Sequence, residues 1–128
     1  MREREQATVD SVFFGIEKDL GCLTFWIMVA YDAGCAQGFG GVNLVNVTEG
    51  RVEDDRSADV ATRFLVEMLD FFGVKQFPDI KGKRVVAIRE EGWNGKILGL
   101  EREDGKRWMM DDFRRRYWPS MFTKGDEG

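Results

Sequence analysis

Histidine is absent from this sequence of 128 residues. Its absence removes the side chain that most often serves as a general base and as a transition-metal ligand. Serine occurs only at Ser11, Ser57 and Ser120, and none of them lies in the pattern of a nucleophile elbow. The acidic pairs at 90–91 and 111–112 lack the spaced oxygen ligands of a calcium loop. We therefore expect a protein that is not an enzyme and that has no metal site and no cofactor.

Cysteine and long apolar runs are also scarce. Cys22 and Cys35 flank an apolar stretch, and a straight strand at about 3.3 Å per residue would hold their sulfurs roughly 30 Å apart. We therefore expect reduced thiols. No apolar run is long enough to cross a membrane, and the N-terminal segment MREREQATVD lacks the apolar core of a secretory signal. These features predict a cytoplasmic protein without membrane association.

The charge balance is mildly acidic, with a net charge of −4. Such a surface gives no electrostatic reason for direct nucleic-acid binding. It would suit a partner with a basic groove, although small domains also carry this much charge for solubility. Negative charge gathers in the polar segment TEGRVEDDR, where Glu53, Asp54 and Asp55 form a candidate interaction surface.

The apolar pattern predicts six strands and one helix. With 43% hydrophobic residues, the chain can bury a core without disulfides or metals. Alternating apolar residues, bounded by glycine turns, predict strands at 9–19, 23–31, 42–47, 84–89, 96–102 and 107–110. Helical spacing of apolar residues predicts a helix over 58–72, with Ser57 as its N-cap and Gly73 as its stop.

The predicted order β-β-β-α-β-β-β indicates a single α+β domain over residues 1–128. An antiparallel sheet of about six strands would pack against one amphipathic helix. We expect an ordered core over about 9–118 and a loose tail at 119–128. Both faces of strand 23–31 are apolar. Its outer face, around Trp26 and Met28, would therefore meet either a second layer of this chain or a second copy in a homodimer.

The segment GCAQGFGG, residues 34–41, allows two interpretations. Glycines let another group approach the backbone, so Gln37, Gly38, Phe39 and Gly40 are candidate ligands for a small, nucleotide-type molecule. The segment lies between strands, however, and no helix or Walker lysine follows it. The alternative is a wide hairpin with a bulge, in which Phe39 packs inward and Gln37 satisfies loop amides.

Three aromatic residues complete the candidate interaction surface. Trp93 lies in the turn EEGWNGK, while Tyr117 and Trp118 follow the basic run 114–116. Exposed aromatics beside arginine are typical of interfaces, but they also fold back over the edge of a core. The basic run itself favours phosphate contacts or, equally simply, a solvated face.

The strand containing TFW, the loop AQGFGG, the helix end FFGV and the strand entry DIKGKRVVAI together resemble a group of small bacteriophage and prophage proteins. The resemblance covers roughly residues 14–110. The loop residues 37–41 match a GQGFGG-like motif, and Gly73 and the run 81–83 match later landmarks. Cys35 and Ala36 depart from the pattern, as does the arginine-rich tail.

The resemblance implies an origin on a mobile element rather than a particular activity. Small acidic proteins of such elements often bind and inhibit a host component, and anti-CRISPR and other anti-defence inhibitors are prominent among them. The implied partner is a host protein or ribonucleoprotein complex in a bacterial cytoplasm. A small-ligand binder and a homodimeric interaction module remain alternatives.

Overall fold

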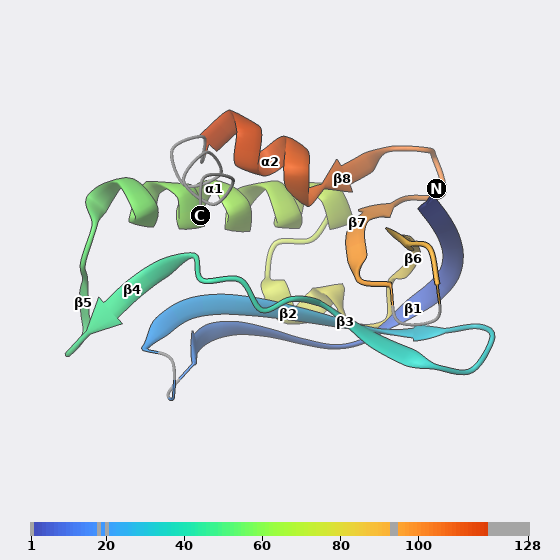
Figure 1. Ribbon diagram of the computed structural model, residues 1–128, viewed down its shortest axis with the longest axis horizontal. Coiled ribbons are helices and arrows are strands. Elements are labelled where there is room, and N and C mark those ends of the chain that lie inside the picture. The colour runs from blue at the N-terminus through green and yellow to red at the C-terminus, as the bar shows by residue number, and fades with distance from the viewer. Residues whose placement is uncertain (1, 18, 20, 93–94, 118–128) are drawn as a thin grey trace.

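The computed structural model describes residues 2–17, 19, 21–92 and 95–117. The fold is α+β, with one antiparallel sheet of eight strands and two α-helices (Figure 1). The elements are β1 (Arg2–Glu17), β2 (Cys22–Tyr31), β3 (Ala36–Gly40), β4 (Val45–Thr48), β5 (Arg51–Val52), α1 (Asp55–Phe72), the 3₁₀ helix η1 (Phe77–Ile80), β6 (Arg84–Glu90), β7 (Ile97–Glu101), β8 (Arg107–Met109) and α2 (Met110–Tyr117).

The long strand β1 joins the two halves of the sheet. Its second half pairs with β2 and its first half pairs with β6 on the opposite edge. The full strand order is β5-β4-β2-β1-β6-β7-β8, and β3 also pairs with β2, beyond the end of β4. Figure 1 shows β1 bending at its N-terminal end, so that the sheet curves around α1. The curvature brings β7 and α2 close to β3.

The core lies between the concave face of the sheet and α1. Phe64 of α1 is completely buried at its centre. Its ring centroid lies 4.1 Å from that of Phe25 on β2 and 5.6 Å from that of Trp108 on β8. Phe113 of α2 lies 5.9 Å from the same ring, so one side chain of α1 contacts both halves of the sheet and the second helix.

Helix α1 begins three residues earlier than expected. Its N-cap is Asp54, not Ser57, because the Asp54 carboxylate accepts hydrogen bonds from the Arg56 amide and the Ser57 hydroxyl. The predicted stop is confirmed: Gly73 adopts φ 68° and its N–H bonds to the last carbonyls of the helix.

The strand expected over 9–19 covers 2–17 instead. The first residues of β1 are mostly charged, so they lack the alternating apolar pattern that predicts a strand. Ion pairs with β6 and β7 hold them in the sheet instead. Arg89 of β6 lies 2.8 Å from the carboxylates of both Glu3 and Glu5, and Arg4 pairs with Glu101 of β7. These cross-strand pairs replace the hydrophobic pattern on which the prediction depended.

The glycine-rich segment also differs from expectation. Residues 36–40 form the strand β3, antiparallel to β2, rather than a loop. The strand expected over 42–47 is shorter, because Gly40 (φ 124°) and Gly41 (φ 74°) turn the chain before β4 begins at Val45. The tail begins with the two-turn helix α2, where the sequence indicated a helical turn. The segment 119–128, which we expected to be loose, lies outside the described residues.

Candidate functional site

Three of the four ligand candidates line one pocket. Gly38, Phe39 and Gly40 form the β3 side of a cavity of about 270 Å³, whose other walls come from β2, β7 and α2. On the β3 side, a ligand in this cavity could contact only backbone atoms and the Phe39 side chain, because Gly38 and Gly40 have no side chains. The fourth candidate, Gln37, lies next to this pocket and has a different role.

Gln37 connects β3 to the opposite half of the sheet. Its Oε1 accepts a hydrogen bond of 2.5 Å from the Tyr31 hydroxyl, and its Nε2 donates one of 2.8 Å to the carbonyl of Gly95, just before β7. Burial raises the pKa of Tyr31, so this hydroxyl keeps its proton and its role as donor. Gln37 thus satisfies a distant turn rather than the amides of its own loop.

The glycines of β3 make room for the side chains of β2. A Cβ added at Gly38 would lie 2.8 Å from Cζ3 of Trp26 and 2.9 Å from Sδ of Met28. A Cβ at Gly41 would overlap the same indole, and one at Gly40 would overlap the carbonyl of Phe25. The backbone of Gly38 and Gly41 therefore forms a flat surface against which the Trp26 indole packs.

Trp26 also shares an exposed surface with Phe13. The two residues are register partners on β2 and β1, on the face of the sheet that points away from α1. Phe13 is 41% exposed and Trp26 is 38% exposed. We call this surface, formed by Phe13, Trp26 and the half-buried Met28, the outer aromatic face.

The pocket beside β3 carries charge at its rim. Lys96 and Arg114 supply two cations, and Asp111, at the start of α2, supplies one carboxylate. Ile97, Leu98 and Met110 form an apolar wall, and Trp26 of β2 also lines the cavity. The arrangement gives a small apolar cavity with a net positive rim.

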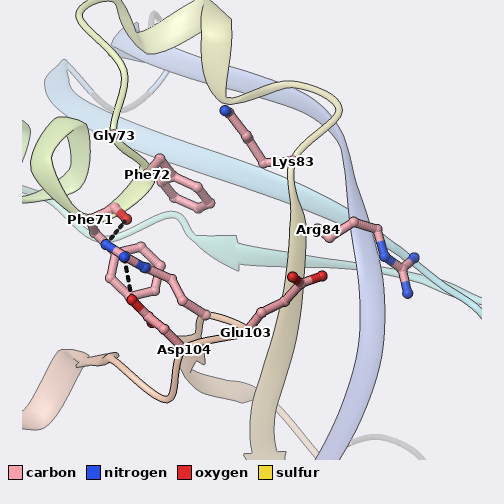
Figure 2. Close-up of a pocket in the computed structure, with 8 residues that line it drawn as sticks. Phe71, Phe72, Gly73, Lys83, Arg84, Glu103 and Asp104 are labelled. Carbon is pink, nitrogen blue, oxygen red and sulfur yellow. Dashed lines mark hydrogen bonds and ion pairs between the residues drawn. The ribbon is translucent and has the colours of Figure 1, made fainter.

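A larger and more open cleft, of about 460 Å³, lies at the C-terminal end of α1 (Figure 2). Two of its three cations, Arg84 and Arg102, are already engaged within the molecule, whereas the side chain of the exposed Lys83 makes no ion pair or hydrogen bond in the described part of the chain. Arg102 donates to the carbonyl of Phe71 and pairs with Asp104, and Arg84 makes two hydrogen bonds of 2.7 Å to Asp32. Figure 2 shows the Arg84 side chain turned away from Phe72. This cleft closes the end of α1, and its remaining cation, Lys83, shares it with the carboxylates of Glu103 and Asp104.

The acidic candidates lie together at the start of α1. Glu53, Asp54 and Asp55 are all exposed. Asp54 is the N-cap of α1. The hydrogen bonds that its carboxylate accepts, first from the Ser57 hydroxyl and then from the Arg56 amide, lower the pKa of this carboxyl. Glu53 accepts a hydrogen bond of 2.6 Å from Thr48. Asp55 is thus the carboxylate of this group with no hydrogen bond from the described part of the chain.

The remaining aromatic candidates divide between described and undescribed residues. Tyr117 is half-buried at the end of α2. The centroid of its ring lies 5.2 Å from that of the Phe113 ring and 4.9 Å from the guanidinium carbon of Arg63. Trp93 and Trp118 lie outside the described residues.

Comparison with known proteins finds no counterpart. No family model matches the chain, and no curated protein or solved structure matches it at a significant level. The resemblance to phage and prophage proteins therefore stays a prediction from the residues that carry it.

Sequence reasoning missed Phe13 and Lys96, and it considered Arg114 only as part of the basic run 114–116. In the strand expected over 9–19, Val12, Phe14 and Ile16 form the predicted apolar face, and Phe13 lies on the opposite one. Lys96 and Arg114 lie far from β3 in sequence. Within residues 2–17, 19, 21–92 and 95–117, no group of three metal-ligating side chains gathers. No helix in this part of the chain combines the length and apolar character needed to cross a membrane.

Proposed function

We propose that this chain is a non-enzymatic binding protein that attaches to a protein partner through its outer aromatic face. The observation that carries the proposal is the exposed register pair Phe13 and Trp26. Tryptophan and other large aromatics supply much of the binding energy at interfaces. Here they stand on an ordered sheet, so little conformational entropy is lost when a partner covers them.

The surroundings of the pair support a flat interface. Gly38 and Gly41 hold no side chain in front of Trp26, and the indole rests on their backbone. Ala30 and Met28 continue the same face along β2 and are half-buried. A partner can therefore approach the aromatic rings without displacing larger groups.

The acidic corner of residues 53–55 supplies a second contribution. Exposed carboxylates there would steer a basic partner and increase the association rate more than the affinity. Because Asp54 caps α1, its replacement also perturbs the helix. The clean test is the double variant Glu53→Gln and Asp55→Asn, for which we expect a weaker salt dependence of association.

The identity of the partner follows from the resemblance, not from the fold. The proposed partner is a host protein or ribonucleoprotein complex, and the proposed role is that of a phage or prophage accessory inhibitor, such as an anti-CRISPR or other anti-defence protein. The acidic surface would then compete for a basic site of the host complex.

Affinity capture from bacterial lysate tests the proposal. Wild-type protein, Phe13→Ser and the control Val66→Ser are compared, because Val66 is a 60% exposed apolar residue on α1, away from the face. We expect a discrete partner with wild type and Val66→Ser, and a loss of about 2 kcal/mol or more of binding free energy with Phe13→Ser.

Equal capture by all three proteins, or equal loss in both variants, contradicts the proposal. Thermal unfolding of each variant confirms that the fold is intact before the comparison.

The same face is the one expected for a homodimer. Sedimentation of the isolated protein separates these functions: a dimer that Phe13→Ser dissociates supports self-association, and a monomer supports a different partner.

A further inference from the structure

The pocket beside β3 contains cations that the protein leaves unpaired. Arg115 and Arg116, on the same helix, pair with Asp112 and Glu67. By contrast, the side chains of Arg114 and Lys96 make no ion pair or hydrogen bond within the described part of the chain. Both nevertheless line the cavity, and Arg114 is half-buried. A half-buried guanidinium without a partner is a favourable site for an anionic group.

The edge of β3 adds backbone groups to the same pocket. The bonds from Tyr31 N–H to Cys35 O and from Gly41 N–H to Phe25 O flank β3 on either side. In the antiparallel register with β2, the hydrogen-bonded positions alternate, so Gln37 and Phe39 are the β3 residues that bond to β2. The N–H and C=O groups of Gly38 and Gly40 therefore point to the other edge, toward the cavity. Within the described residues, β3 pairs with no strand on that edge. A ligand in the pocket meets free donors as well as cations.

The apolar wall and the volume limit the size of the ligand. Ile97 and Met110 are buried, and Leu98 is half-buried, so the wall favours an apolar body. The volume of about 270 Å³ lies just below the usual range for ligand pockets, about 300–1,000 Å³. This space suits a compact molecule with a single ring or branched chain, and is small for a dinucleotide.

From these features we infer that the pocket binds a small organic acid with one carboxylate and a compact apolar body. The carboxylate lies between Arg114 and Lys96, and the apolar body packs on Ile97 and Met110. Asp111 reduces the net charge of the rim to one positive unit, which favours a monoanion over a polyphosphate. The pocket shares Trp26 with the outer aromatic face. The inference does not rest on the proposed function, because Arg114, Lys96 and the apolar wall of Ile97 and Met110 lie outside that face.

A titration of ¹⁵N-labelled protein with phenylacetate, followed by NMR, tests the inference. Phenethylammonium, with the same ring and the opposite charge, is the matched probe. We expect phenylacetate to shift the amide signals of Gly38, Gly40 and Leu98 in a saturable manner, and phenethylammonium to leave them in place.

Arg114→Gln should weaken phenylacetate binding by about tenfold, because the charged partner of the carboxylate is lost. Arg115→Gln, one residue away and directed at Asp112, should leave the affinity unchanged. If Arg114→Gln does not fold, Lys96→Gln replaces it, since Lys96 is exposed. The inference is overturned if phenylacetate causes no saturable shift. It is equally overturned if both probes bind alike, if the shifts map elsewhere, or if the Arg114 and Arg115 variants respond equally.

Discussion

The indole ring of Trp26 rests on the backbone of Gly38, in the adjacent strand. A Cβ at position 38 would lie 2.8 Å from Cζ3 of that ring and 2.9 Å from Sδ of Met28. The glycine-rich segment is therefore shaped by the side chains of β2. It supports an exposed aromatic face on one side of β3 and opens a pocket at its edge.

Gly41→Ala should destabilise the protein more than Gly50→Ala. Both glycines have nearly the same φ, 74° and 77°, so both variants carry similar backbone strain. An added Cβ overlaps the Trp26 indole at position 41 and meets no atom within 4 Å at position 50. We expect an additional loss of about 1–3 kcal/mol in the free energy of unfolding for Gly41→Ala, measured by urea denaturation. Equal losses would show that Trp26 does not depend on this glycine.

Gln37→Leu should weaken the connection between β3 and the turn before β7. The change removes the acceptor for the Tyr31 hydroxyl and the donor to the Gly95 carbonyl. We expect a loss of about 1–3 kcal/mol in unfolding free energy. The exposed Gln76, whose side chain makes no capping bond, provides the control variant Gln76→Leu.

A double-mutant cycle with Tyr31→Phe isolates the Tyr31–Gln37 bond. The double variant should lose less stability than the sum of the single variants, because the shared hydrogen bond is counted twice in that sum. Strict additivity would contradict a direct bond between the two side chains.

The N-cap of α1 should make stability depend on pH in acid. Hydrogen bonds from Ser57 and Arg56 lower the pKa of Asp54 below its ordinary value of 3.8. The stabilisation is therefore complete above this value and is lost as the pH falls through the lower, folded-state pKa. At neutral pH, Asp54→Ala should lower the Tm by a few degrees. The difference from wild type should shrink below about pH 4.

Thermal unfolding by circular dichroism from neutral to acidic pH measures this effect. Asp55→Ala is the matched control, since the Asp55 carboxylate accepts no hydrogen bond from the described residues. A pH-independent difference between Asp54→Ala and wild type would indicate that the carboxylate does not act as the cap.

The sequence predicted the parts of the fold that apolar periodicity encodes. The strand over 23–31 and the helix ending at Gly73 follow directly from alternating and helical spacing. The first half of β1 carries alternating charges and is held by Arg89 and Arg4, so apolar periodicity could not reveal it. Helix α2 buries only Met110 and Phe113 among polar neighbours, which leaves a weak signal.

The candidate site was less accessible to sequence reasoning. Phe39 packs inward, as one interpretation of the glycine segment predicted, and is 2% exposed. The pocket itself depends on contacts between distant segments: Gln37 and Gly95 are 58 residues apart, and Arg114 lies farther still. Their proximity arises from the curvature of the sheet, which no local pattern specifies.

Photocrosslinking in bacterial cells tests the central claim most directly. A photoreactive phenylalanine analogue replaces Phe13 in one variant and Val66 in a second, so both probes are exposed but only one lies on the outer aromatic face. The proposed function predicts a discrete crosslinked partner from position 13 that position 66 does not produce. No adduct from position 13, the same adducts from both positions, or an adduct of two copies of this chain would contradict a partner that binds on this face.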